Sequence, residues 1–100
     1  MKMDIPTPIY WAACNGHTEI VKILAPLTDN PNASYKHGET PIYWAAYNGY
    51  TEIVKILAPL TNNPNAPNKV GQTPIHWAER FGHKEIVKIL APYAKRAKKF

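Results

Sequence analysis

The sequence predicts an all-α chain built from three stacked helix–turn–helix units. The first observation is a period of 33 residues, at which Thr-Pro-Ile recurs at Thr7, Thr40 and Thr73. The second is that the rest of each unit keeps this register, including one tryptophan, one glycine and a Glu-Ile-Val-Lys-Ile-Leu block whose apolar residues recur at helical spacing. A match of this length at constant spacing is the signature of a repeat architecture. We expect one domain over residues 1–100, with repeats at about 1–33, 34–66 and 67–100.

The first helix of each unit has recognisable start and stop signals. A threonine hydroxyl can accept a hydrogen bond from an otherwise unpaired backbone N–H, and proline suits the first helical position. Thr7, Thr40 and Thr73 are therefore predicted N-caps. Glycine can take the left-handed conformation that closes a helix. The glycines expected to do so are Gly16, Gly49 and Gly82.

A second helix follows each of these glycines. In the first unit, Glu19 and Lys22 are spaced for an ion pair on the exposed side, while the isoleucines, valine and leucine of the block supply the apolar face. A proline follows each block and is expected to stop or kink the helix. These prolines are Pro26, Pro59 and Pro92.

The repeated unit resembles the ankyrin repeat. The resemblance rests on Thr-Pro-Ile-His-Trp-Ala at 73–78, the 33-residue period and the helix–turn–helix pattern, and it covers nearly the whole chain. It implies stacked helix pairs joined by β-hairpin fingers, with ligands held by the finger tips and by the first helices on the concave side. The fingers are expected at about 34–39 and 67–72. The family's usual Gly-Ala-Asp is replaced at 28–31 and 61–64, where we expect a different loop with an asparagine at positive φ.

Positions at which the repeats differ are the candidates for binding, because shared residues are explained by repeat packing. Tyr35 and Tyr47 stand where the other repeats carry different residues, although an exposed side chain without a role is the alternative for both. At 100° per residue, Tyr43 and Tyr47 project away from the buried face expected around Ile42, and this side is the expected ligand face. The predicted partner-binding residues are Tyr35, Tyr43, Tyr47, Tyr10, Trp11, Trp44, Asn48, Lys36, His37, Glu39, Lys69, Trp77, Arg80 and Phe81.

Scaffold roles compete with binding for several of these aromatic residues. Each repeat carries one tryptophan at the same position, namely Trp11, Trp44 and Trp77. Because this position does not vary, we interpret the tryptophans first as packing partly beneath the fingers. Tyr10 and Tyr43 replace a histidine that, from the resemblance, hydrogen-bonds to the N-cap threonine. The lost bond costs about 1 kcal/mol in each repeat. We therefore expect a compensating interaction, and partner binding is one candidate.

The residues favour a binding module over an enzyme. Cys14 has no histidine and orienting partner that the sequence identifies as a catalytic set, and the carboxylates are dispersed. The four histidines form no recognisable ligand set, and every glycine is explained by a turn rather than by a phosphate loop. We expect no catalytic residue, no cofactor and no metal site. Because no apolar segment of signal-peptide or membrane-span type is found, we expect a soluble, non-secreted protein, either cytoplasmic or recombinantly produced.

Net charge leaves the class of partner partly open. The formal charge of +5 and the aromatic residues would suit nucleic acid or another acidic ligand. The basic residues that would serve such a ligand are Lys36, Lys69, Arg80, Lys95, Arg96, Lys98 and Lys99. The last four lie in the C-terminal segment, where a helix end favours cations without any partner. A protein partner of unknown identity is therefore the favoured interpretation, and a scaffold without a ligand is the third. Near-identical repeats with a local tyrosine cluster are typical of a designed binder, and the aromatic face could also self-associate.

Overall fold

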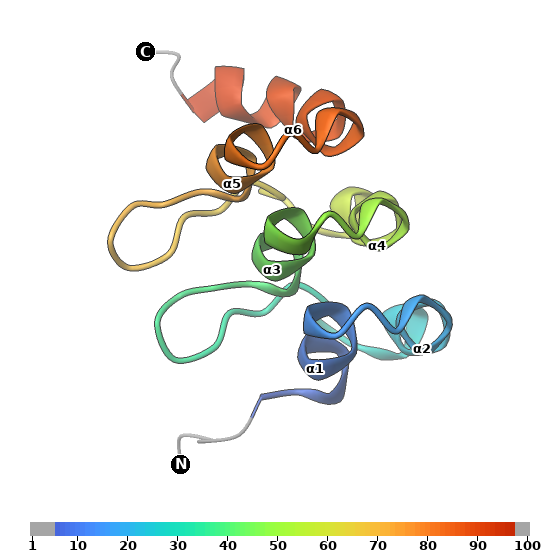
Figure 1. Ribbon diagram of the computed structural model, residues 1–100. Coiled ribbons are helices and arrows are strands. Elements are labelled where there is room, and N and C mark those ends of the chain that lie inside the picture. The colour runs from blue at the N-terminus through green and yellow to red at the C-terminus, as the bar shows by residue number, and fades with distance from the viewer. Residues whose placement is uncertain (1–5, 98–100) are drawn as a thin grey trace.

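The computed structural model describes residues 6–97 of the chain, and these form helices and turns without a named β-strand. The helices stack as three pairs, so the predicted all-α repeat solenoid is confirmed (Figure 1). The pairs are α1 (Pro8–Cys14) with α2 (Thr18–Leu24), α3 (Pro41–Asn48) with α4 (Thr51–Leu57), and α5 (Pro74–Arg80) with α6 (Lys84–Ala97). Short 3₁₀ helices, η1 (Ala25–Leu27) and η2 (Ala58–Leu60), extend α2 and α4.

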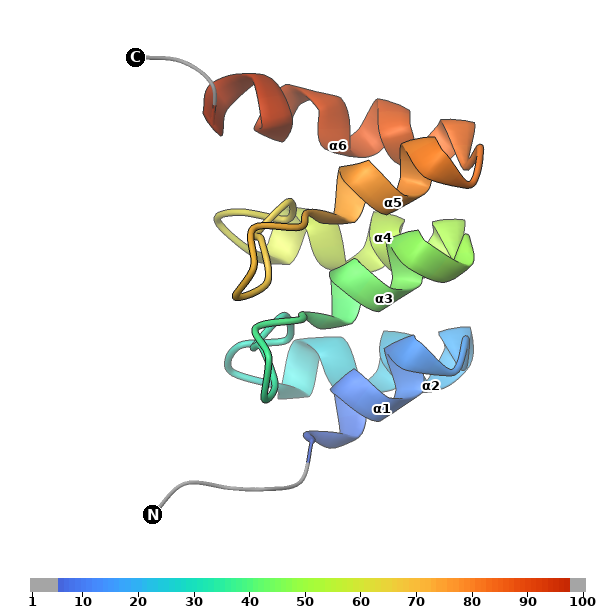
Figure 2. The same ribbon diagram turned by 60° about the vertical axis from the view of Figure 1, so that its left-hand side comes forward.

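The six helices form two parallel layers, as both views of the ribbon show (Figures 1 and 2). The first helices of the repeats, α1, α3 and α5, pack side by side in one layer, and the second helices form the other. The finger segments project from the layer of first helices (Figure 1). The core lies between the layers and consists of small and branched side chains. It includes Ile9, Ala12, Ala13, Val21, Ile42, Ala45, Ala46, Ile53, Val54, Leu57, Ala78, Ile86 and Leu90.

Each first helix begins as the sequence predicts. The threonine side chain before the helix accepts a hydrogen bond from the backbone N–H three residues later, which satisfies one of the free donors at the helix start. The three bonds are Tyr10 N to Thr7 Oγ1 at 3.2 Å, Tyr43 N to Thr40 Oγ1 at 3.0 Å and His76 N to Thr73 Oγ1 at 3.3 Å.

The glycine between the two helices is required for backbone conformation and, in the first two repeats, for space. Gly16 and Gly49 have φ of 76° and 81°, a region that side-chain-bearing residues rarely adopt. A Cβ atom on Gly16 would lie 2.9 Å from the ring of Tyr50, and one on Gly49 would lie 2.7 Å from the ring of His83. Tyr50 and His83, the residues before α4 and α6, therefore pack on the turn of the preceding repeat.

The connection between repeats differs from the expectation in one respect. No residue other than glycine has a positive φ within 6–97, so the expected left-handed asparagine is wrong. Asparagine acts through its side chain instead. The Oδ1 atoms of Asn32 and Asn65 accept from the backbone N–H of Ile42 and Ile75, each at 2.9 Å, and so tie the loop to the start of the next helix.

The prolines after the second helices have different effects in the three repeats. In the first two repeats the α-helix ends and proline enters a 3₁₀ turn, whereas in the last repeat α6 continues through Pro92. Tyr-Ala-Lys-Arg-Ala follows Pro92, and these residues favour helix more than the Leu-Thr-Asx of the other repeats. The longer α6 extends over the end of α5 (Figure 2).

Candidate partner-binding surface

The first finger is a tight turn closed by backbone hydrogen bonds. The N–H of Tyr35 donates to the carbonyl of Glu39 at 2.9 Å, and the N–H of Gly38 donates to the carbonyl of Tyr35 at 2.7 Å. Tyr35 and Glu39 form an isolated antiparallel bridge, so the expected hairpin is present only in its shortest form. The Nζ of Lys36 lies 6.0 Å from the centroid of the Tyr35 ring, within range of a cation–π interaction.

The second finger repeats this geometry and is bonded to the first. The N–H of Asn68 donates to the carbonyl of Gln72 at 2.8 Å, and the side-chain oxygen of Asn68 accepts from Val70 N and Gln72 N. The N–H of Lys69 donates to the carbonyl of His37 at 2.8 Å. The two finger tips are therefore held in fixed relative positions by the backbone.

Tyr10 and Tyr43 do not lie on an exposed ligand face, so this expectation is wrong. Both are buried, and Tyr43 is only 3% exposed. The indole N–H of Trp44 donates to the hydroxyl of Tyr10 at 2.8 Å, and that of Trp77 donates to the hydroxyl of Tyr43 at 2.7 Å. The angular positions of side chains around a single helix gave the wrong prediction, because residues of the neighbouring repeat cover each of these tyrosine rings. These tyrosine–tryptophan bonds supply the compensation expected for the replaced histidine.

The second finger also covers Tyr43. The hydroxyl of Tyr43 accepts from Asn68 Nδ2 at 3.2 Å and donates to Gln72 Oε1 at 3.5 Å. Burial raises the pKa of Tyr43, with a smaller opposing effect from the Trp77 hydrogen bond. Burial likewise raises the pKa of Tyr10. Both hydroxyls are thus kept neutral and available for their structural bonds.

The tryptophans occupy two kinds of environment. Trp44 and Trp77 are half-buried and bonded to the tyrosine of the preceding repeat, as the scaffold interpretation expects. Trp11 belongs to the first repeat and is exposed, with its ring 4.9 Å from that of His17. The same residue type therefore supports the scaffold in two repeats, where it stays partly accessible, and is more fully exposed in the first repeat.

An aromatic cluster lies on α3 and at the C-terminal end of α5, and we define it as Tyr47, Trp77 and Phe81. Ring centroids are 5.0 Å apart for Tyr47–Trp77, 5.1 Å for Tyr47–Phe81 and 5.9 Å for Trp77–Phe81, the last pair being stacked at 18°. Phe81 is 45% exposed, and Arg80 beside it is exposed as well. Asn48 is also exposed, and its Nδ2 donates to the carbonyl of Trp44 at 3.0 Å. Of the predicted residues in this region, the structure brings Tyr47, Trp77 and Phe81 into contact with one another.

Val70 is an exposed apolar residue that the sequence analysis did not single out. It is 78% exposed at the tip of the second finger, in the position that His37 holds in the first. The sequence did offer a signal for this exposure, because an apolar residue between lysine and glycine in a turn is not placed to pack in the core.

The described side chains offer little for catalysis or metal binding. Burial raises the pKa of the Cys14 thiol to about 11, Glu39 adds to this effect and a hydrogen bond with Tyr10 opposes it. The thiol is therefore protonated and weakly nucleophilic near neutral pH. Within residues 6–97 no group of three His, Cys, Asp or Glu could hold a metal ion, and no helix there is long and apolar enough to span a membrane.

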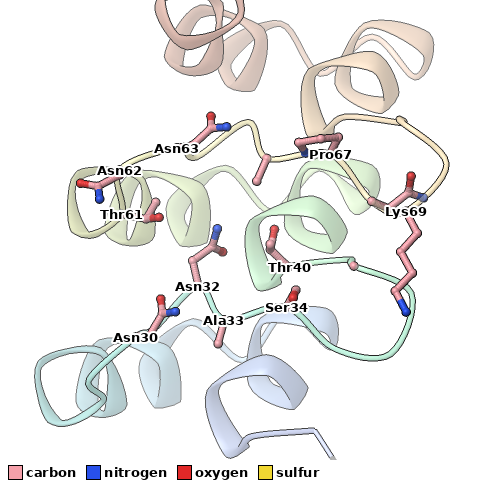
Figure 3. Close-up of a pocket in the computed structure, with 13 residues that line it drawn as sticks. Asn30, Asn32, Ala33, Ser34, Thr40, Thr61, Asn62, Asn63, Pro67 and Lys69 are labelled. Carbon is pink, nitrogen blue, oxygen red and sulfur yellow. The ribbon is translucent and has the colours of Figure 1, made fainter. Parts of the chain in front are cut away.

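An open cavity of about 460 Å³ lies between the two asparagine-rich loops (Figure 3), and no residue of the aromatic cluster lines it. Asn30 and Asn32 line it on one loop, and Asn62 and Asn63 line it on the next. Asn32 also caps the following helix, as described above. The lining mixes polar residues with Ala33, Ala66 and Pro67, and it carries one cation, Lys69, without a convergent set of charged groups.

Comparison with known families agrees with this architecture. A family model described as ankyrin repeats (three copies) matches residues 2–68, and the ankyrin repeat model matches residues 70–97. The chain belongs to the ankyrin repeat family. Ankyrin repeats are generally protein–protein interaction modules and are typically not enzymes. No curated protein matches this ankyrin repeat chain in sequence.

Proposed function

We propose that this ankyrin repeat protein binds another protein through its two fingers and the aromatic cluster. The observation that carries the proposal is the contact of Tyr47, Trp77 and Phe81 in one patch, with Phe81 and Arg80 exposed at its edge. Tyrosine, tryptophan and arginine are enriched among the residues that dominate the energetics of protein interfaces. For tyrosine and tryptophan the reason is a large contact area with only two rotatable bonds.

Rigidity of the patch supports the same proposal. Trp77 is fixed by its hydrogen bond to Tyr43, and the backbone carbonyl of Tyr47 lies 3.3 Å from Nε2 of His83. Side chains that are already ordered lose little entropy on binding. Tyr10 and Tyr43 therefore serve the surface as buried supports, whereas Tyr47 and Phe81 contact the partner.

Charge favours a partner with an acidic segment. On the second helices, each Glu-Lys pair is closed, with N–O distances of 3.3, 3.5 and 3.8 Å in the three repeats. Lys36, Lys69 and Arg80 on the finger and first-helix side have no ion pair within the described residues. Free cations on the fingers and on the first helices would steer an acidic protein segment toward this side of the molecule.

The proposed contact set takes in the accessible candidates from both fingers and from the first helices. The contact set consists of Tyr35, Lys36, His37, Glu39, Lys69 and Val70 on the fingers and Trp11, Trp44, Tyr47, Asn48, Trp77, Arg80 and Phe81 on the first helices and at the end of α5.

A designed or selected origin of the chain is also part of the proposal, and it rests on the near-identity of the three repeats.

The test is a binding measurement on matched variants. A partner is captured on the immobilised chain from a displayed protein library, and its affinity is measured by titration calorimetry. Phe81→Ala should weaken binding by on the order of 2 kcal/mol, close to thirtyfold. Lys88→Ala, on the second helix of the same repeat, should leave affinity unchanged. Equal affinities of wild type and Phe81→Ala would rule out the aromatic cluster as the interface.

A parallel titration tests nucleic acid as the ligand. Single-stranded DNA of mixed sequence should bind far more weakly than the captured protein. Binding to DNA with an affinity matching that of the captured protein, together with a steep loss on adding salt, would overturn the choice of a protein partner.

A further inference from the structure

Glu39 carries a carboxylate without a partner at the base of the first finger. Its backbone closes the finger, because its carbonyl accepts from the N–H of Tyr35 at 2.9 Å. Glu39 is only partly exposed, and within the described residues its side chain makes neither an ion pair nor a hydrogen bond. A carboxylate that is partly withdrawn from water loses part of its hydration, and no other group replaces it here.

The second finger shows this position with its polar atoms satisfied. Gln72 is the equivalent of Glu39, and its Oε1 accepts from Asn68 Nδ2 at 3.1 Å and from the hydroxyl of Tyr43 at 3.5 Å. In the first finger, Tyr35 stands in the place of Asn68 and has no amide to donate. The first finger therefore combines a charged acceptor with the loss of the donor that serves its counterpart.

Glu39 lies beside three buried groups on the first-helix side. Burial is the main cause of the raised pKa of Tyr10, Tyr43 and the Cys14 thiol, and the negative charge of Glu39 is a smaller cause of each. The ring of Tyr10 also packs on that of Tyr35, with 5.3 Å between centroids. The carboxylate is therefore placed between the first finger and the helices α1 and α3, within the surface proposed to meet the partner.

No cation of the chain serves this carboxylate in the part that the structure describes. Lys36 lies near the ring of Tyr35, with its Nζ 6.0 Å from the centroid, and Lys69 and Arg80 are likewise without an ion pair there. A metal ion is not the missing cation either, because the same residues include no group of three His, Cys, Asp or Glu that could hold one.

Support of helix α3 does not explain the charge. Glu39 precedes the N-cap Thr40, where a carboxylate interacts favourably with the helix dipole. However, α1 and α5 begin with the same threonine cap after Pro6 and Gln72, neither of which is charged. The start of a first helix therefore does not require a carboxylate.

We propose that the protein partner supplies a basic side chain, lysine or arginine, that forms an ion pair with Glu39 at the base of the first finger. This inference rests on the proposed function and adds that the partner carries both signs of charge on the segment it presents. Acidic residues of that segment are attracted by Lys36, Lys69 and Arg80, whereas one basic residue enters toward Glu39. Glu39 then selects among acidic partners, because one without this cation leaves the carboxylate buried and unpaired.

Glu39→Gln tests the pair, because it removes the charge, keeps the shape of the side chain and gives the first finger the residue of the second. The probe is the protein captured from the displayed library, and its affinity is measured by titration calorimetry. Glu39→Gln should weaken binding on the order of thirtyfold. Glu79→Gln makes the same change at an exposed glutamate outside the contact set and should leave affinity unchanged.

Double-mutant cycles identify the partner's side of the pair. Each lysine and arginine of the captured protein is changed to methionine in turn, and each variant is measured against the wild-type and Glu39→Gln chains. One of these changes should weaken binding on the order of thirtyfold with the wild-type chain and have little effect with Glu39→Gln. If the effect of every such change is independent of Glu39, the carboxylate meets no cation of the partner and the ion pair is wrong.

Two further outcomes are informative. If Phe81→Ala weakens binding and Glu39→Gln does not, the aromatic cluster remains the interface and only the ion pair is overturned, whereas the proposed function fails as well if neither variant weakens binding. Urea unfolding of the free chain is the second measurement, and Glu39→Gln should shift its midpoint little. A loss of stability large enough to account for the loss of affinity would assign Glu39 to the support of α3 and overturn the inference.

Discussion

The two layers of helices differ in what varies from repeat to repeat. In the layer of second helices the burial of the residues varies, whereas in the layer of first helices and fingers the sequence itself varies. In the second helices, the Glu-Ile-Val-Lys-Ile-Leu block is identical in all three repeats, and only its place in the stack alters its burial. In the first helices the sequence itself changes, as at Cys14, Tyr47 and Arg80, which hold one equivalent position. Identical residues can therefore have different environments by position alone, whereas at the substituted positions the side chain itself changes the surface.

The largest expected effect tests the second-helix layer. Ile53→Ala should lower the free energy of unfolding by about 3 kcal/mol, because it removes a fully buried side chain between two repeats. Ile20→Ala makes the same change in the same block and should cost less than about 1 kcal/mol, because Ile20 is already partly exposed. Urea unfolding of dilute samples measures both. Equal losses would mean that repeat position does not control the contribution of this block.

A smaller effect separates two tyrosines on α3. Tyr43→Phe should cost about 1.5 kcal/mol of stability, since it removes the acceptor of the Trp77 indole and a partner of Asn68. Tyr47→Phe on the same helix should be nearly neutral in stability. Thermal and urea unfolding of the two variants checks this difference. If Tyr43→Phe were as stable as wild type, the tyrosine–tryptophan bond would have no scaffold role.

The fold could be predicted from the sequence because its determinants are local and repeated. The threonine caps, the glycines between helices and the apolar spacing each act within a few residues, and each is present three times. The surface was predicted less well because it depends on contacts between repeats. Tyr43 projects outward from its own helix, yet Trp77 and the second finger cover it from 25 to 34 residues away. The angular position of a residue around its own helix cannot reveal that a neighbouring repeat covers it. The recurrence of a tyrosine and a tryptophan 34 residues apart, at Tyr10–Trp44 and Tyr43–Trp77, could have suggested the contact.

The smallest expected effect compares one lysine from each layer. Lys55 pairs with Glu52 at 3.5 Å, and both side chains are more than half exposed, so Lys55→Ala should change stability by only about 0.3 kcal/mol. Because that charge is already paired and lies on the second-helix side, the variant should also leave the association rate with an acidic protein partner unchanged. Lys69→Ala should likewise have little effect on stability, but it removes a free cation at the finger and should slow association at low salt, with the difference fading as salt screens the charge. Stopped-flow association at two salt concentrations measures this, and equal slowing by the two variants would show that net charge, rather than the finger surface, guides the partner.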